Sequence, residues 1–180
     1  PMTFPRRPAP LRVAELEPRD TPSAAAYVLS GDSLVAVNIA FPSANRPPIP
    51  VTGLVGADTL VGIDIRPATG QLYGLGSDGA GLVRLYVIDP LTGAAAPVGA
   101  GGLAVPGDKF GFDFNPVADR VRVVSNAGTN ARLNPDTGGL VQLDAPLNGG
   151  ATVASATAYT NSFPGATVTT EYTIDSASGT

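Results

Sequence analysis

The chain has 180 residues, a net charge of −4, and neither histidine nor cysteine. Without them it has no imidazole acid–base group, no Ser-His-Asp triad, no thiol nucleophile, no disulfide and no ordinary zinc site. The net negative charge argues against nucleic-acid binding, which needs a basic surface. The sequence contains no run of 18 apolar residues, so no membrane-spanning segment is predicted.

The first 26 residues form a leader that contains six prolines and four arginines. Proline at this density disfavours helix and strand, so we expect the leader to be disordered. Residues 16–23 read Leu-Glu-Pro-Arg-Asp-Thr-Pro-Ser, which resembles the Leu-Glu-x-Arg-x-x-Pro motif near the N terminus of many exported proteins of planctomycete-type bacteria. The resemblance implies an extracytoplasmic protein, secreted or at the cell surface.

From Tyr27 onward the chain consists of short segments rich in Val, Ile, Thr, Tyr and Phe, separated by Gly, Pro, Asn and Asp. This pattern is typical of β-strands, and no helical periodicity accompanies it. The predicted strands are Ser33–Ala40, Leu60–Ile65, Gln71–Leu75, Val83–Ile88, Ala95–Val98, Phe110–Phe114, Arg120–Ser125, Ala131–Leu133, Leu140–Leu143, Ala154–Tyr159 and Thr169–Ile174.

Two kinds of turn alternate along these strands. Residues 89–93 and 134–138 form one set, with 175–179 as a looser copy, and residues 66–70 and 115–119 form the other. Asp or Asn in the first place can accept a bond from its own backbone, proline presets φ, and a closing glycine adopts the left-handed conformation. Corresponding turns recur every 41–49 residues, which gives four strands per repeat.

Four strands in 41–49 residues is the period of a β-propeller blade. We therefore predict an all-β, propeller-like domain over residues 27–180, built from four-stranded antiparallel blades. Complete blades are expected at 60–98 and 110–143, with partial blades at 27–54 and 154–180. The expected ring is incomplete and the chain truncated. Two alternatives stay open: a four-unit ring closed by pairing the partial blades, and a stack of sheets that is not a propeller.

Several segments, in this order, resemble one bacterial family. They are residues 60–77 (LVGIDIRPATGQLYGLGS), 110–125 (FGFDFNPVADRVRVVS), 132–138 (RLNPDTG) and 158–163 (AYTNSF). Together they are similar to the domain of unknown function 4394. The resemblance implies a propeller-like, extracytoplasmic domain. It implies no activity, and it supplies no functional residues.

The candidate ligand-binding residues are polar groups on the strands and in the longer loops. In a propeller the tight proline turns share one face, so the longer loops 76–81, 99–108, 125–130 and 147–151 are expected on the other, where we place a ligand site. The candidates are Asp64, Arg66, Asp113, Asn115, Arg120, Arg122, Asn126, Asn130 and Arg132.

Asp64 and Asp113 occupy equivalent places between apolar neighbours, where a strand disfavours aspartate. They either bind a cation or sugar hydroxyls, or they stabilise the repeat through hydrogen bonds or ion pairs with nearby arginines. The second interpretation is favoured, because a catalytic group is seldom needed in every repeat. Arg120 and Arg122 share one strand face and are expected to pair with Asp113 or Asp119.

These observations favour a non-catalytic exported module that binds an envelope or extracellular protein or glycan, or that serves as a structural unit. No catalytic residue and no metal ligand is assigned, and calcium is the only cofactor left open, through loop oxygens such as those of Asp78 and Asp108. The alternative is an aspartate-based hydrolase or lyase, with or without calcium, that acts on an extracellular polymer.

Overall fold

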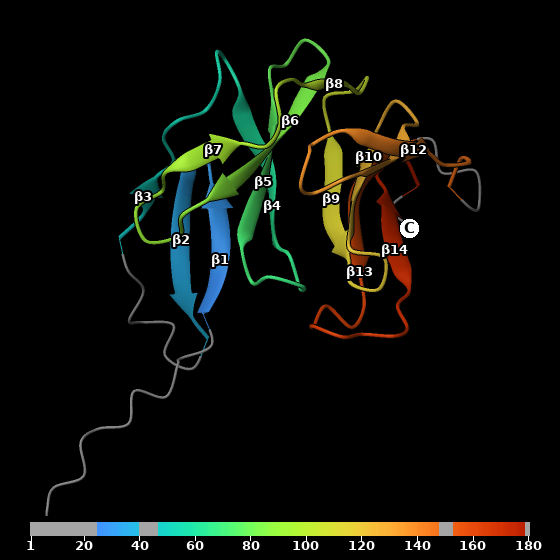
Figure 1. The fold of residues 1–180 in the computed structure, drawn as a ribbon. Coiled ribbons are helices and arrows are strands. Elements are labelled where there is room, and N and C mark those ends of the chain that lie inside the picture. The colour runs from blue at the N-terminus through green and yellow to red at the C-terminus, as the bar shows by residue number, and fades with distance from the viewer. Residues whose placement is uncertain (1–24, 40–46, 148–152, 179–180) are drawn as a thin grey trace, which may run out of the picture.

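A computed structural model describes residues 25–39, 47–147 and 153–178. Within these residues it has fourteen strands and no helix, so the predicted all-β class is confirmed (Figure 1). The first sheet contains β1 (Ala25–Ser30), β2 (Ser33–Asn38) and β3 (Ile49–Pro50). The second contains β4 (Thr59–Ile65), β5 (Leu72–Ser77), β6 (Leu82–Ile88) and β7 (Ala95–Pro97), with β8 (Leu103–Ala104) also paired to β6.

The third sheet contains β9 (Phe110–Asn115), β10 (Arg120–Ser125), β11 (Asn130–Leu133) and β12 (Leu140–Leu143). The last pair is β13 (Ala154–Tyr159) and β14 (Glu171–Asp175). Strands follow one another in chain order and pair antiparallel, because turns of a few residues can only reverse the chain. The second sheet spans residues 59–104 and the third spans residues 110–143.

The proline turns close as their residue types dictate. Gly70 and Gly93 have φ of 73° and 75°, and each donates its N–H to the carbonyl oxygen four residues earlier, at 2.8 Å. The turn from Asn115 to Asp119 has no glycine, and Asp119 adopts φ of 49° in its place. Aspartate is one of the few residues that tolerate this conformation.

Two boundaries differ from the prediction. The first strand starts at Ala25, whereas the sequence pattern began at Tyr27; the rest of the predicted leader, residues 1–24, lies outside the described residues. The turns at 89–93 and 134–138 join the third and fourth strands of their sheets. The segment that begins at Asp175 instead follows the second strand of its hairpin, since Asp175 pairs with Ala154, so it is not a third copy of that turn. Its sequence resembles that turn because both begin with an aspartate that accepts a bond from the backbone two residues on.

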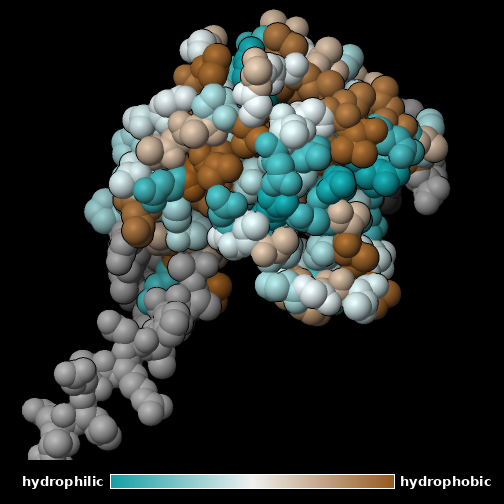
Figure 2. All heavy atoms as spheres, viewed as in Figure 1, coloured by the Kyte–Doolittle hydropathy of each residue, from teal (hydrophilic) through white to brown (hydrophobic). Residues whose placement is uncertain are grey.

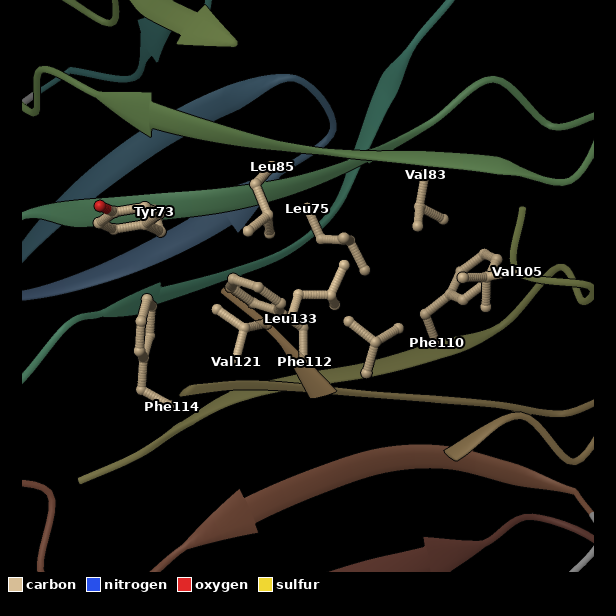
Figure 3. Close-up of a cluster of buried hydrophobic side chains, with 11 residues drawn as sticks. Tyr73, Leu75, Val83, Leu85, Val105, Phe110, Phe112, Phe114, Val121 and Leu133 are labelled. Carbon is tan, nitrogen blue, oxygen red and sulfur yellow. The ribbon is translucent and has the colours of Figure 1, made fainter. Parts of the chain in front are cut away.

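One hydrophobic core fills the space between the second and third sheets (Figure 3). The second sheet contributes Tyr73, Leu75 and Leu85, and the third contributes residues that include Phe112 and Phe114. The Tyr73 and Phe114 rings meet edge to face with centroids 5.1 Å apart. Aromatic pairs favour this geometry, and it locks the two sheets together.

A second core lies between the first and second sheets and contains side chains from the opposite face of the second sheet. Leu72 and Ile88 point into this core, while Tyr73 and Leu85 point into the other. The alternation follows from the two-residue period of a strand. The second sheet is therefore buried on both faces, which explains why β5 is buried along its whole length.

The first strands of the second, third and last sheets pack against one another. β4 lies against β9, and β9 lies against β13 (Figure 1). These three strands, here called the inner strands, bring residues about 50 positions apart into contact. The polar candidates on them therefore meet at the seams between sheets.

Candidate functional site

Asp64 and Asp113 each accept a hydrogen bond from the backbone of the next inner strand. The Oδ2 atom of Asp64 on β4 accepts the N–H of Phe114 at 2.8 Å, and Oδ2 of Asp113 on β9 accepts the N–H of Tyr159 at 2.6 Å. Phe114 and Tyr159 hold corresponding positions on β9 and β13. The two carboxylates thus perform the same task at successive seams, which is the structural role that their repetition favoured.

A glycine two residues before each aspartate allows the close approach. A β-carbon on Gly111 would lie 2.6 Å from the backbone nitrogen of Thr157 on β13, and one on Gly62 would lie 3.0 Å from the β-carbon of Phe112 on β9. The Gly-x-Asp pattern therefore combines a gap for the neighbouring strand with an acceptor for its N–H. On β13 the corresponding residues are Ala156 and Ala158, so the pattern stops there.

The two carboxyl groups also interact with each other. Burial raises the pKa of Asp64 above its usual value. Burial first and the charge of Asp64 second raise the pKa of Asp113 to about 8.

Arg66 bridges the second and third sheets. Its guanidinium donates to both carboxylate oxygens of Asp119, at 2.8 and 2.5 Å, and to Asp136 at 2.6 Å. The Arg66 side chain is only 8% exposed, and its hydrogen bonds to Asp119 hold the pKa of that carboxyl below its usual range. The two carboxylates neutralise the charge of this guanidinium, so it is poorly placed to attract an anionic ligand.

Arg122 and Arg132 meet at one carboxylate, that of Asp144. Arg132 donates to both of its oxygens and Arg122 to one. These bonds, with those of Arg132 the larger, lower the pKa of Asp144 to about 2. Asn130 accepts from Arg122 at 2.6 Å and donates to the Ala145 carbonyl, so it belongs to the same network.

This network continues into the last hairpin. The Arg122 Nε atom donates to the Tyr159 hydroxyl at 3.0 Å and lies 3.2 Å from a carboxylate oxygen of Glu171. The predicted pairing of Arg122 with Asp113 or Asp119 is therefore wrong, although Arg122 lies directly opposite Asp113 in the sheet. The guanidinium reaches across to β14 because Asp113 is already bonded to β13.

The three remaining candidates have local roles. Asn115 accepts the N–H groups of Val117 and Ala118 and so shapes its turn. Arg120 donates to the carbonyl of Asp119, and Asn126 ties its loop to Asp108 through a 2.5 Å bond. None of these three residues forms a hydrogen bond with Asp64 or Asp113.

The sequence argument missed Asp58, which is 5% exposed. Its carboxylate accepts from Arg84 at 2.5 Å and from the Tyr86 hydroxyl at 2.6 Å. Asp58 lies just before a strand, and the corresponding position of the next repeat has no aspartate. The sequence therefore contained no repeated pattern that could have identified it. Among the described residues, no buried side-chain nitrogen or oxygen lacks a hydrogen-bond partner.

An open depression of about 550 Å³ lies at the end of the molecule where the proline turns gather. Residues 64–70 line one side, and Ser162 and Pro164 line the other. The second side belongs to the connection between β13 and β14, which takes eleven residues (160–170) where the two preceding sheets use six (66–71) and four (116–119) (Figure 1). Asp64 and Arg66 thus border a depression, at the opposite end from the predicted loop face.

The surface around these elements mixes polar and apolar character. Figure 2 shows adjoining hydrophilic and hydrophobic patches on one face. In the connection 160–170, Phe163 is 53% exposed and Val168 is 69% exposed. In the described part of the chain there is no group of three or more acidic side chains that could hold a metal ion, and no helix has the length and apolar character needed to cross a membrane. Residues 148–151 of the predicted ligand-binding loops lie outside the described part.

Comparison with known proteins identifies one family. A family model described as Domain of unknown function (DUF4394) matches residues 33–180, a range that contains every strand except β1. No curated protein matches the chain.

Proposed function

The chain belongs to the family Domain of unknown function (DUF4394), and from this premise we propose that it is a non-catalytic, exported, propeller-like module that binds a macromolecular partner. One observation carries the proposal: the charged groups best suited to chemistry are already engaged between sheets. Asp64, Asp113 and Arg66 bond across the seams. Because these side chains hold the sheets together, we expect function to depend on other groups at the surface.

The successive seams support the propeller arrangement. At the inner strands, Asp64 and Asp113 make the same bond one sheet apart. At the outer strands, Thr52 pairs with Ala94 across the first seam, and a β-carbon on Gly99 would lie 2.1 Å from the Thr137 carbonyl across the second. Close backbone approaches that recur at the inner and outer ends of successive sheets are what a repeating blade interface requires.

The depression beside Asp64 is the surface best suited to the partner. Its second wall is built by the longest connection at that end of the molecule, and departures from a repeat are where function concentrates. Ser162 supplies a hydroxyl, and Phe163 an exposed ring beside it. Asp119 and Asp136 neutralise the charge of Arg66, so the depression favours a neutral glycan or an uncharged peptide segment over an anion. The resemblance of residues 16–23 to an export motif favours a partner outside the cytoplasm.

The test is binding of the whole chain to an array of neutral glycans and to solubilised envelope proteins. We expect a retained ligand whose affinity falls at least tenfold in Ser162→Ala or Phe163→Ala. Val168→Ala, in the same connection and more exposed, is the matched control and should bind as the wild type does. Absence of any ligand, or binding that neither variant weakens, would overturn this site.

A second candidate is an aspartate-based hydrolase or lyase that acts on an extracellular polymer. Asp64 lines an open depression and Asp113 has a raised pKa, and these two features favour it because paired aspartates serve as acid–base groups in hydrolases. Asp113→Asn would then abolish polymer cleavage with little change in melting temperature. A lack of cleavage by the wild-type chain, with and without added calcium, would count against this candidate.

A further inference from the structure

The last hairpin, β13 and β14, turns an apolar face away from the third sheet. On its inward side the Tyr159 hydroxyl accepts from Arg122, so alternation along the strands points the neighbouring residues outward. These outward residues are Ala156 and Ala158 on β13, which lie opposite Ile174 and Tyr172 on β14. Tyr172 is 65% exposed and Ile174 is 55% exposed. Apolar residues that lie side by side at the surface mark an interaction site more often than scattered ones do.

This face repeats a pair of side chains that is buried elsewhere in the chain. Tyr73 and Leu75 on β5 lie opposite the Gly-x-Asp pattern of β4. Tyr172 and Ile174 lie in the same register, opposite the two alanines that replace this pattern on β13. The third sheet covers the first pair, which belongs to the core between the sheets, and the Phe114 ring meets that of Tyr73 edge to face. The second pair has the same place in its sheet and is exposed.

The first sheet contains counterparts of the last three strands of the second sheet. At the first seam a β-carbon on Gly93 would overlap the carbonyl oxygen of Pro50, and at the second seam one on Gly138 would overlap that of Val98. β3 therefore corresponds to β7, and β1 and β2 correspond to β5 and β6. Tyr27 on β1 is then the counterpart of the tyrosine on β5, and it packs in the core between the first and second sheets.

The outward face of the first sheet is apolar as well. Leu29 and Leu34 point into the core shared with the second sheet, so their neighbours along the strands point away from it. These outward residues are Ala26, Val28, Val35 and Val37. Val28 is 48% exposed, and neither β1 nor β2 contains a charged residue. Figure 1 shows this sheet and the last hairpin on opposite sides of the molecule.

The outward face of the first sheet has a counterpart that covers a tyrosine within the chain. Ala26 lies opposite Val37 in the register of β1 and β2. The residues in the same places on β5 and β6 are Leu72 and Ile88, which share a core with Tyr27. The outward face of the first sheet therefore corresponds to the face of the second sheet that packs on Tyr27.

The seams join faces of the same chemical character. Arg122 on β10 holds the place that Tyr73 has on β5, and it meets polar groups of the last hairpin, the Tyr159 hydroxyl and the Glu171 carboxylate. Tyr73 itself meets an aromatic ring in an apolar core. The face that contains Tyr172 is apolar, so the sheet that fits it is apolar too.

We propose that the first sheet of a second copy of this chain packs on the last hairpin, outward face to outward face. The contact between copies continues the series of seams within each copy, and it buries Tyr172 and Ile174 against Val28 and its neighbours. Because it joins two different faces, the contact is head to tail and produces a closed ring or an open chain of copies. It uses neither the depression nor the connection 160–170, so it is independent of the proposed binding function.

Sedimentation velocity of the whole chain, from about 1 to about 200 µM, tests this contact. The wild-type chain should form oligomers whose fraction rises with concentration. Ile174→Lys and Val28→Lys each place an ammonium group in the contact, so each should weaken association about tenfold or more. Leu91→Lys adds the same charge in a turn of the second sheet, at a residue 71% exposed, and should associate as the wild type does.

A mixture of the two variants distinguishes a head-to-tail contact from a contact between identical faces. Val28→Lys keeps an intact last hairpin, and Ile174→Lys keeps an intact first sheet. An equimolar mixture should therefore form one-to-one dimers that neither variant forms alone. Because an unfolded chain cannot restore the contact, the same measurement shows that both variants are folded.

Three results would overturn the proposal. They are a wild-type chain that stays monomeric over the whole concentration range, association that Val28→Lys leaves unchanged, and a mixture of the two variants that does not associate. No ligand takes part in these measurements, so failure of the contact and failure of the proposed binding function remain distinguishable.

Discussion

Arg66 and Asp119, fifty-three residues apart in the chain, are joined by two parallel N–H···O bonds of 2.8 and 2.5 Å. Asp119 is also the residue that takes the left-handed conformation where the neighbouring turns have glycine. One aspartate thus closes a turn of the third sheet and fastens that turn to the end of β4. Bidentate pairing gives this contact both strength and a fixed orientation.

Loss of the guanidinium should loosen the seam. We expect Arg66→Met to lower the free energy of unfolding by about 1–3 kcal/mol, below the cost of breaking a fully buried pair because water reaches Asp119 and Asp136. Arg120→Met, which removes one bond to a backbone carbonyl, should cost about 0.5 kcal/mol or less. Urea unfolding measures both values, and equal losses in the two variants would contradict the assignment.

The turn conformation of Asp119 can be separated from its ion pair. Asp119→Gly and Asp119→Ala both remove the carboxylate, but only glycine adopts a φ of 49° without strain. We expect the glycine variant to be more stable than the alanine variant by about 1 kcal/mol, as judged by thermal and urea unfolding. If alanine is equally stable, the turn is not held in the left-handed conformation.

The close approach of β9 and β13 should make Gly111 intolerant of any side chain. In Gly111→Ala the new methyl group would meet backbone atoms of Ala156 and Thr157 at 2.6–2.7 Å, and backbone cannot move aside as a side chain can. The expected loss is about 1–3 kcal/mol. Gly101→Ala, whose methyl group meets nothing within 4 Å, is the control and should leave the melting temperature nearly unchanged.

Tyr86 should support the buried carboxylate of Asp58 through its hydroxyl. In Tyr86→Phe, Asp58 loses a 2.6 Å donor and the Val55 N–H loses its acceptor. A loss of about 1–3 kcal/mol in the free energy of unfolding is expected. Tyr172→Phe, at a position 65% exposed, should change stability by less than about 0.5 kcal/mol. A Tyr86→Phe chain as stable as the wild type would show that Arg84 alone satisfies Asp58.

Asp144 should make the stability of the chain depend on pH at the acid end of the range. Its pKa falls to about 2 in the folded chain, so its stabilising effect is present above about pH 4 and is lost as pH falls towards 2. Asp144→Asn should therefore be less stable than the wild type at pH 6, and the difference should narrow between pH 4 and pH 2. Unfolding by urea at a series of pH values tests this, and a difference that stays constant with pH would contradict it.

Most of the strand order could be predicted from the sequence because turns are local. Asp89 and Gly93 specify their turn within five residues, and the distance to the next such turn sets the repeat. The predicted strands did not include β1, which begins inside the predicted leader. The strands β3 and β8 were also not predicted, because two residues carry no alternation pattern. The copy at Asp175 was misplaced because a turn motif does not reveal which end of the sheet it occupies.

The candidate site was predictable only in part. Aspartates inside strands marked Asp64 and Asp113 as residues with a polar task, but their partners are backbone N–H groups, which every residue except proline carries and which leave no sequence signature. Arg122 was recognised, yet Asp144 and Glu171, which neutralise it, were not. Loop length favoured one end of the molecule, and the depression lies at the other because one connection there, residues 160–170, breaks the repeat.

The sequence by itself determined the all-β class, the turn chemistry, the repeat and the absence of groups that ordinarily titrate near neutral pH. Only the tertiary structure decided that two aspartates one repeat apart each accept a backbone N–H of the next inner strand, and that burial raises their pKa values. Local rules act over a few residues, through φ and alternation, whereas a carboxyl pKa depends on which charges and how little water surround it. Those surroundings come from strands about 50 residues apart, and they exist only once the sheets have packed.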